Sequence, residues 1–299
     1  MMIGGLVCVL SAYLLWALFP LYFKALDCVS ALEILSHRIV WSLVFAVIVL
    51  FFLRRWQWIR QLRLAPKIFV YFAASSLLIA VNWGTYIYAV LSGVVIDASF
   101  GYFINPLVTV LLGAVCLREK LRPTQWFCVA IAAAAVLFLT IARGNLPLIS
   151  LVLATSFGLY GLVRKIAPLG SLEGFSLESA MLFPFALGYL VYLALTGEMV
   201  FLNHSAYIDW LLLAAGPITA VPLLLFASGA RRIPYSILGI TQYSSPTIQF
   251  FMAIYVFNEP LSMTQLFAFG LIWVAVALFT AESIVWYRKL KKTQIEKAS

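Results

Sequence analysis

Charged residues are scarce in this chain. Asp, Glu, Lys and Arg make up 10% of its 299 residues, whereas hydrophobic residues make up 64% and the mean hydropathy is +1.04. A soluble domain of this size has too little interior to hide so many apolar side chains from water. The composition therefore argues against a soluble fold and predicts an all-α polytopic membrane protein.

Residues that carry catalysis are equally few. The chain has two histidines, and it contains no HExxH, GxSxG, GxGD-like or Walker A sequence. These absences argue against an intramembrane enzyme and against an ATP-driven pump within this chain, and they predict no cofactor. The four cysteines have no CxxC spacing, so we expect small buried apolar side chains rather than ligands or disulfides. They are Cys8, Cys28, Cys116 and Cys128.

Ten long apolar runs take up most of the chain. At about 1.5 Å per residue, a run of about 20 residues spans the hydrocarbon core of a bilayer. The first run has no basic n-region and no small-residue cleavage site, so we expect a retained span rather than a signal peptide. The sixth is short and rich in small residues, which is typical of a helix packed tightly among neighbours. The predicted spans are 3–23, 32–53, 68–91, 97–117, 124–142, 147–163, 175–195, 208–229, 236–257 and 264–286.

One stretch of sequence occurs twice, 140 positions apart. GYFINPLVTVLLGAVCLREKLRPTQWF, from Gly101, returns as TQYSSPTIQFFMAIYVFNEPLSMTQLF, from Thr241. Each copy is an apolar run, a turn that contains Glu and a second apolar run, which predicts a duplicated helical hairpin. Five spans per half is an odd number, so the second copy enters the membrane in the opposite sense. We therefore predict two inverted-topology five-helix repeats, 1–143 and 144–287, and a basic cytoplasmic tail, 288–299.

The positive charges are distributed unequally between the two sides of the predicted membrane. With the N-terminus inside, Lys24, Arg38 and Arg143 are the only Lys and Arg of the 20 that fall on the outer side. The positive-inside rule then places both termini in the cytoplasm. The same distribution explains the net charge of +9 by contact with anionic lipid head groups rather than with nucleic acid.

Seven longer segments resemble one family. They are AYLLWALFPLYFKAL at 12–26, EILSHRIVWS at 33–42, NWGTYIYAV at 82–90, DASFGYFINPLVTVLLG at 97–113, SFGLYGLVRK at 156–165, PLLLFASGARRIPYSILGITQYSSPT at 222–247 and FGLIWVAVALF at 269–279. On these segments, nearly the whole chain resembles the RarD branch of the EamA-type drug/metabolite transporters. The resemblance implies a ten-helix permease of the bacterial inner membrane. The chain departs from the family at two places. Asp97 stands where the family leads us to expect glutamate, and Ser244-Ser245 stand where it leads us to expect a more apolar or glycine-containing pair. These departures bear on substrate choice rather than on fold.

Side-chain amides lie well inside three of the apolar runs. An unpaired amide in hydrocarbon is costly, so each must face protein or a wet cavity. Two interpretations stay open: hydrogen bonds between helices, and the lining of a substrate cavity. Neighbouring aromatic side chains suit an apolar or aromatic solute whose polar end the amides bind. The candidate cavity residues are Trp16, Asn82, Trp83, Tyr86, Tyr102, Asn105, Tyr160, Gln242 and Tyr243.

Two prolines and two glutamates recur at equivalent positions of the repeat. Pro106 and Pro246 each remove a backbone hydrogen bond, which produces either a fixed kink or a flexing point with a free carbonyl. Glu119 and Glu259 end the equivalent spans on opposite faces of the membrane. A solvated or capping carboxylate is the simple interpretation there, and a coupling role is the alternative.

Ionisable residues in the second span are candidates for gating or coupling. Arg38 lies about seven residues into its run, which is about 10 Å deep. Glu33 and His37 share one helix face because they are four residues apart. Charge at such depth marks a functional site by default, and the alternative is that Arg38 snorkels to the outer head groups.

The repeat offset extends this argument to the inner face, because it makes Glu178 the counterpart of Arg38. We predict an outer gate in which Arg38 pairs with Asp97. We also predict an inner gate in which Glu178 pairs with Arg231 or Arg232. Each pair would form in one state only and so bias the equilibrium between the two states.

The sequence as a whole predicts a secondary-active or facilitative permease that moves a small organic metabolite or drug by alternating access. The rivals are a non-transporting membrane scaffold or accessory subunit and an intramembrane enzyme. A scaffold does not require buried amides or charges inside its spans. The expected partners are a small-molecule substrate and the lipid bilayer.

Overall fold

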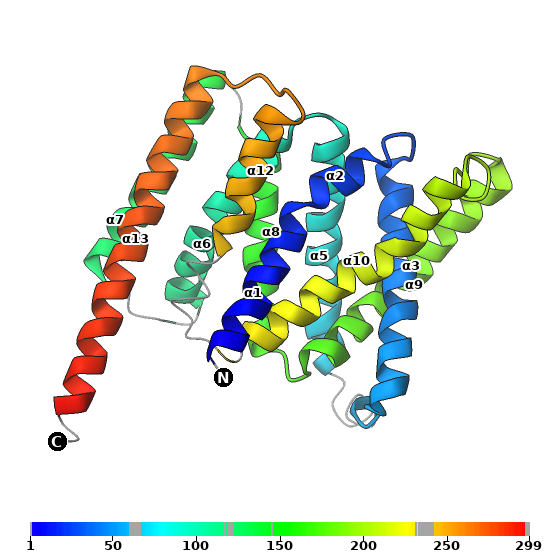
Figure 1. The fold of residues 1–299 in the computed structure, drawn as a ribbon, viewed down its shortest axis with the longest axis horizontal. Coiled ribbons are helices and arrows are strands. Elements are labelled where there is room, and N and C mark those ends of the chain that lie inside the picture. The colour runs from blue at the N-terminus through cyan, green and yellow to red at the C-terminus, as the bar shows by residue number, and fades with distance from the viewer. Residues whose placement is uncertain are drawn as a thin grey trace.

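A computed structural model describes residues 2–59, 67–116, 118, 122–144, 146–230, 232 and 242–296, and every regular element in these ranges is a helix. The helices are α1 (Met2–Ala17), α2 (Phe19–Lys24), α3 (Ala31–Leu53), α5 (Lys67–Leu91), α6 (Val95–Cys116), α7 (Pro123–Arg143), α8 (Leu148–Ile166), α9 (Ser171–Thr196), α10 (Ala206–Ala230), α12 (Ser244–Tyr255) and α13 (Met263–Glu296). Helix α1 begins and α13 ends at the same edge of the bundle (Figure 1). Glu119 and Arg231 lie outside the described residues.

The first predicted span is two helices rather than one. Helix α1 ends just before Leu18, and Pro20 lies in the first turn of α2. Proline has no N–H, and its ring clashes with the carbonyl four residues earlier, so it interrupts a helix that would otherwise continue. Within α2, the rings of Phe19 and Phe23 contact the guanidinium of Arg38 on α3.

Gln125 and Gln265, which are equivalent in the repeat, cap equivalent helices. The side-chain oxygen of Gln125 accepts a hydrogen bond from the backbone N–H of Arg122 at 3.0 Å, and that of Gln265 accepts one from Ser262 at 2.9 Å. A glutamine at the third helical position that bonds back in this way satisfies a donor that the helix start leaves free. The repeated glutamine is therefore explained by the starts of α7 and α13.

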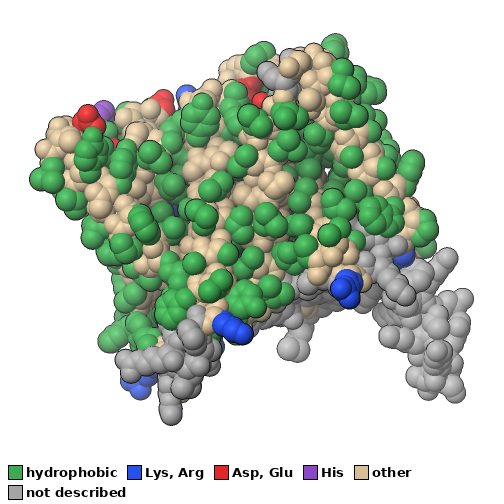
Figure 2. Space-filling model, turned by 180° about the vertical axis from the view of Figure 1, so that it is seen from behind, with side chains coloured by type: hydrophobic (Ala, Val, Ile, Leu, Met, Phe, Trp, Pro, Cys, Tyr) green, Lys and Arg blue, Asp and Glu red, His purple; other side chains and the backbone are tan. Residues whose placement is uncertain are grey.

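Eight helices in the described part of the chain are long and apolar enough to cross a membrane. They correspond to predicted spans one to five, seven, eight and ten. The sixth is the shorter apolar helix Leu148–Arg164, and α12 represents the ninth. Hydrophobic side chains cover the broad middle of the face in Figure 2, most of the Lys and Arg lie along its lower edge, and Asp, Glu and His lie along its upper edge. The chain is an all-α polytopic membrane protein.

Helix α8 is packed tightly, as its small residues predict. It lies against α5 and α6, with Ser150 and Ser156 buried. A Cβ added at Gly101 of α6 would lie 2.7 Å from the backbone oxygen of Ser150, so the two backbones are in contact. Lipid is as apolar as a helix surface, so close van der Waals packing and hydrogen bonds hold helices together in a membrane.

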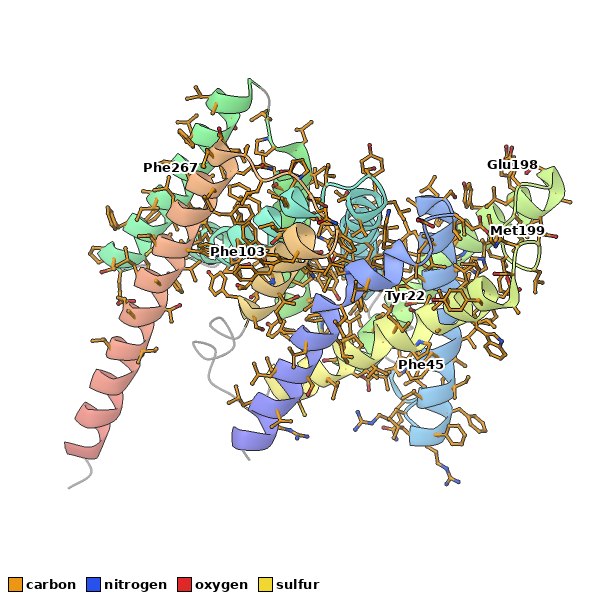
Figure 3. The ribbon with its side chains drawn as sticks, turned by 45° about the horizontal axis from the view of Figure 1, so that its top comes forward. Tyr22, Phe45, Phe103, Glu198, Met199 and Phe267 are labelled. Carbon is orange, nitrogen blue, oxygen red and sulfur yellow. The ribbon has the colours of Figure 1, made fainter. Side chains whose placement is uncertain are left out.

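Two groups of helices are distinguishable in Figure 1. Helices α7 and α13 pack mainly against each other at one side of the molecule, and the remaining helices form the main bundle. Helix α6 links the two groups through an aromatic cluster. In this cluster Phe103 of α6, which is labelled in Figure 3, contacts Phe269 of α13 at a centroid distance of 5.8 Å. Phe269 in turn contacts Phe250 of α12 at 4.4 Å.

The cysteines differ in part from expectation. Only Cys128 is fully buried; Cys8 is half-buried, and Cys28 and Cys116 are exposed. Cys28 lies in the turn between α2 and α3, and Cys116 is the last residue of α6, so both stand at helix ends rather than among packed helices. The expectation of burial was wrong for these two residues, and all four cysteines are free.

Candidate functional site

A cavity of about 110 Å³ lies inside the main bundle. Its walls come from both halves of the sequence. The lining residues are Tyr13, Trp16, Phe19, Arg38, Ile79, Asn82, Trp83, Tyr86, Tyr102, Phe157, Leu223, Phe226, Gln242, Ser245, Pro246 and Gln249. Pockets for drug-sized ligands are usually about 300–1,000 Å³, so in this conformation the cavity suits a small solute.

Most of the predicted cavity residues lie around this space, and three do not. Trp16, Asn82, Trp83, Tyr86, Tyr102 and Gln242 line it. Asn105 stands behind Gln242, whose Nε2 donates to Asn105 Oδ1 at 3.1 Å. Tyr243 instead stacks on Phe103, and Tyr160 bonds to Glu178.

Asn82 both forms hydrogen bonds between helices and lines the cavity, the two roles that we considered for the buried amides. Its Nδ2 donates to the carbonyl of Leu153 and to Oγ of Ser156, both at 3.1 Å, so it joins α5 to α8. Its Oδ1 accepts from the Tyr102 hydroxyl at 3.2 Å. Both N–H donors of this amide and one of the two acceptor positions of its oxygen are therefore used within the protein. Asn82 shapes the wall of the cavity and orients Tyr102, and it has no free N–H to donate to a solute.

Arg38 is the charged residue of the cavity wall, and it is only 4% exposed. Its Nε donates to Thr219 Oγ1 of α10 at 2.7 Å, and the ring of Trp83 lies 4.1 Å from its Cζ. Around it, the Tyr22 hydroxyl donates to the carbonyl of Leu211 at 2.8 Å, and Figure 3 shows Tyr22 beside α10. Arg38 is held at a fixed position inside the protein and does not snorkel to the surface.

Two polar residues of the wall, Ser245 and Gln249, were not among the predicted residues. Gln249 is 3% exposed, its Nε2 donates to the carbonyl of Trp16 at 3.0 Å, and its Oε1 is buried without a hydrogen-bond partner within the described part of the chain. Gln242, Ser245, Pro246 and Gln249 follow the spacing i, i+3, i+4 and i+7 of one helix face. This spacing was the available signal for Ser245 and Gln249.

One end of the cavity is aromatic. Tyr13 and Trp16 of α1 and Phe226 of α10 form a triangle with ring centroids 5.6 to 5.9 Å apart. Tilted and edge-to-face arrangements of this kind are favourable, and they offer ring faces to a flat apolar solute. Of the three, only Trp16 was predicted.

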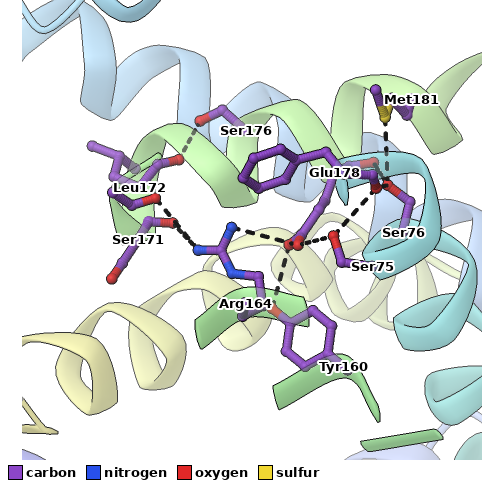
Figure 4. A network of polar contacts seen from close by, with 11 residues as sticks. Ser75, Ser76, Tyr160, Arg164, Ser171, Leu172, Ser176, Glu178 and Met181 are labelled. Carbon is purple, nitrogen blue, oxygen red and sulfur yellow. Dashed lines mark hydrogen bonds and ion pairs between the residues drawn. The ribbon is translucent and has the colours of Figure 1, made fainter. Parts of the chain in front are cut away.

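Glu178 is the centre of a second polar cluster, where the first halves of α5 and α9 meet the last turns of α8 (Figure 4). It is 2% exposed. Its Oε1 accepts from Ser75 Oγ at 2.6 Å and lies 3.5 Å from Nη1 of Arg164, and its Oε2 accepts from the Tyr160 hydroxyl at 3.3 Å. A buried carboxylate that has lost its water is stable only with such partners. The cluster explains why Tyr160 lies away from the cavity.

Among the described residues, Arg38 does not pair with Asp97 and Glu178 does not pair with Arg232; Arg231, the other predicted partner of Glu178, lies outside the described part of the chain. No carboxylate in the described part of the chain forms an ion pair with Arg38. Glu178 pairs with Arg164 rather than with Arg232, which is exposed. The spacing argument chose partners by their depth in the membrane alone. Arg164 is nearer because the last turns of α8 lie beside the first turns of α9.

Two carboxylates hold turns between helices against the opposite half of the chain. Oε1 of Glu33 accepts from the backbone N–H groups of Val200 and Phe201, at 2.9 and 3.1 Å. Glu259 accepts from those of Val95 and Ile96, at 2.7 and 2.9 Å, at the N-terminus of α6. A carboxylate at this end of a helix is favoured by the free N–H groups and the helix dipole. Both glutamates thus join segments far apart in sequence.

Asp97 and His37, the remaining described residues that we predicted for gating or coupling, are neighbours of these two carboxylates. Asp97 lies in the first turn of α6, near Glu259. Burial raises the pKa of Glu259 above its ordinary 4.5, Asp97 raises it further, and the two backbone hydrogen bonds oppose the rise. His37 lies with Nε2 4.0 Å from Glu33, and its Nδ1 accepts from the Trp41 indole at 3.1 Å.

Each of the two repeated prolines follows a cavity-lining residue by four positions. Pro106 lies inside α6 and leaves the carbonyl of Tyr102 without its usual helical donor. Pro246 lies four residues after Gln242 but in the first turn of α12, where a proline removes no helical hydrogen bond, and its own carbonyl accepts from Ser99 Oγ at 2.7 Å. The predicted loss of a helical hydrogen bond therefore applies to Pro106 of α6 and not to Pro246.

Comparisons with known proteins agree with this architecture. Residues 3–141 match the EamA-like transporter family. The chain is 46% identical to "Uncharacterized transporter YojE" of Bacillus subtilis, over 96% of this chain and 97% of that protein. It is 41% identical to "Protein RarD" of Streptomyces exfoliatus (99% and 93% covered) and 38% identical to "Protein RarD" of Escherichia coli (96% and 97%). The chain belongs to the RarD branch of the EamA-like transporter family.

This membership confirms the resemblance predicted from the seven segments and makes the chain a multi-pass membrane transporter. One solved structure, named only "Crystal structure of protein", matches the RarD-like chain with a TM-score of 0.62 at 18% identity, over 93% of this chain and 98% of that one. At this identity the match supports the fold alone.

Proposed function

We propose that this RarD-like protein is a bacterial inner-membrane permease, secondary-active or facilitative, that moves a small organic metabolite or drug by alternating access. The observation that carries the proposal is the cavity. It lies within the bundle, it draws its walls from both halves of the chain, and its described lining residues include one buried cation and several amides. A scaffold has no need of such a space, and a transporter binds its solute in one.

We further propose that residues 1–143 and 144–287 act as two inverted repeats that rock against each other. The helix packing supports this. If α1, α3, α5, α6 and α7 correspond to α8, α9, α10, α12 and α13, then the contact of α1 with α10 corresponds to that of α8 with α5. The contact of α6 with α8 likewise corresponds to that of α12 with α1, and the contacts of α3 with α9 and of α7 with α13 correspond to themselves. Such a correspondence is expected of a two-fold related pair.

The orientation that we propose has both termini and residues 288–299 in the cytoplasm. Helix α1 begins at the lower edge of Figure 1, and the concentration of Lys and Arg along the lower edge of Figure 2, which is turned about the vertical axis, supports this orientation. In this orientation the Glu178 cluster lies toward the cytoplasm, and the bonds of Glu33 and Glu259 lie toward the outside. We propose that the Glu178–Arg164 pair closes the inner side of the cavity in one state and opens in the other.

Comparative metabolite profiling tests the function. Solutes are measured inside and outside cells of a deletion strain and of an overexpressing strain. We expect at least one small organic solute to shift in opposite directions in the two strains, and the shift to be lost when the overexpressed protein carries Trp16→Ala and Phe226→Ala. If no solute shifts although the protein is abundant in the membrane, the permease function is wrong and a scaffold becomes the better account.

A further inference from the structure

The guanidinium of Arg38 has an unused hydrogen-bonding edge inside the cavity. Its Nε is bonded to Thr219, and one of its faces is covered by Trp83. Its two terminal nitrogens have no hydrogen-bond partner within the described residues. A guanidinium presents these nitrogens as a planar fork that matches the two oxygens of a carboxylate. The contacts of Arg38 therefore orient the fork and leave it free.

The rest of the wall leaves this positive charge uncompensated. Of the described residues that line the cavity, only Arg38 is charged. Tyr86 lines the cavity, its hydroxyl is buried with no hydrogen-bond partner among the described residues, and it lies close enough to Arg38 to interact with it electrostatically. A hydroxyl donates readily to a carboxylate oxygen. A buried cation is costly when it is alone, and a bound anion would remove that cost.

We propose that the solute of this permease is a small organic anion, with one carboxylate bound by the Arg38 fork and the Tyr86 hydroxyl and a flat apolar body against Tyr13, Trp16 and Phe226. The inference rests on the permease function proposed above and names its substrate class. The aromatic triangle gives the body of the solute its ring contacts, and the small volume of the cavity excludes large anions.

A pair of probes that differ only in charge tests the anion site. Phenylacetate and its neutral isostere phenylacetamide are titrated by calorimetry into the purified full-length protein in lipid nanodiscs. Charge-assisted hydrogen bonds are the strong ones, so we expect phenylacetate to bind at least about tenfold more tightly than the amide. Arg38→Gln should abolish this preference. Arg38→Lys, which keeps the charge but not the fork, should retain only part of it.

Two further variants separate the site from folding and from surface charge. Tyr86→Phe removes one hydroxyl without changing the ring, so it should weaken phenylacetate severalfold and leave phenylacetamide unchanged, whether or not Arg38→Gln folds. Lys24→Gln removes an exposed cation of the same half of the protein and should retain the full preference. Three outcomes would overturn the proposal. The two probes bind equally, or the preference for phenylacetate is unchanged in Tyr86→Phe and Arg38→Lys, or phenylacetate does not bind at any soluble concentration.

Metabolite profiling distinguishes failure of this inference from failure of the permease function. If the solute that shifts between the deletion and overexpressing strains is neutral or cationic, the permease stands and the anion site is wrong. If the solute is an organic anion whose shift Arg38→Gln abolishes at normal protein abundance, both proposals are supported.

Discussion

Replacing Glu178 by glutamine removes one negative charge from the cluster of Figure 4 and keeps the size of the side chain. Removing one partner of a fully buried ion pair costs about 3–5 kcal/mol. Here the cost is smaller, because Arg164 is 16% exposed and its Nη2 still reaches the carbonyls of Gly170 and Ser171 at 3.4 Å. The glutamine oxygen can also still accept from Ser75. We therefore expect a loss of about 1–2 kcal/mol, which is about 5–30-fold in the population of the closed inner side.

The assay follows exposure of a residue that this closure buries. Ile68, near the start of α5, is 5% exposed and packs in the cluster that contains Leu177 of α9. In a variant without native cysteines, Ile68→Cys is labelled with a membrane-impermeant maleimide in inside-out vesicles. We expect Glu178→Gln to raise the labelling rate about 5–30-fold, because the rate follows the fraction of molecules that are open on the inner side.

Two controls make the result specific to the gate. Glu282→Gln breaks the 2.7 Å ion pair with Arg122, which joins α7 to α13 away from the main bundle, and should leave the rate unchanged. Val47→Cys, which is 42% exposed on α3 and faces lipid, should stay unreactive in every background. If Glu178→Gln lowers the melting temperature but labels at the original rate, the cluster stabilises the fold and is not a gate.

Three further predictions concern topology, pH and packing. Reporter fusions after Gly93 should be active outside the cell, and those after Lys292 inside. The pKa of Glu259 is raised in the folded state, so its protonation stabilises the protein at acid pH, and this stability is lost as the pH rises through the raised pKa. The melting temperature of the wild type, measured against that of Glu259→Gln, should therefore fall as the pH rises above 4.5. Gly216→Ala places a Cβ against the backbone carbonyl of Trp41 and should destabilise by about 1–3 kcal/mol.

Each of the three has an outcome that contradicts it. A cytoplasmic signal after Gly93 would remove the predicted span order and the inverted repeat with it. A constant difference in melting temperature between the wild type and Glu259→Gln at every pH would show that the carboxyl titrates normally. Gly188→Ala is the matched control for Gly216, because nothing lies within 4 Å of its added Cβ; equal effects of the two substitutions would refute the close contact of α10 with α3.

Several features of this protein follow from local sequence. A membrane helix needs about 20 apolar residues, so the lengths of α3, α5 and α9 could be predicted to within a few residues. The shared capping role of Gln125 and Gln265 is local as well, because each side chain bonds three residues back. The seven family segments were sufficient to predict the transporter family.

The directions of the buried side chains could not be predicted in the same way. A helix that is apolar all round has no hydrophobic stripe, so its sequence does not show which face points into the bundle. For this reason Tyr160 and Tyr243 were placed in the cavity, and Gln249 was overlooked. Only the packing of α8 on α5 and of α12 on α1 and α6 decides which of these side chains reaches the cavity.

The partners of the buried charges show most clearly what the sequence alone cannot determine. From the sequence, Arg38 and Glu178 were recognisable as charges too deep in the membrane to be solvated. Depth is a property of one helix, and it is set by the local run of apolar residues. The partners, Thr219 for Arg38 and Arg164 and Ser75 for Glu178, depend on which helices cross at that depth. Thr219 is 181 residues from Arg38 along the chain, and only the tertiary fold brings the two within 2.7 Å.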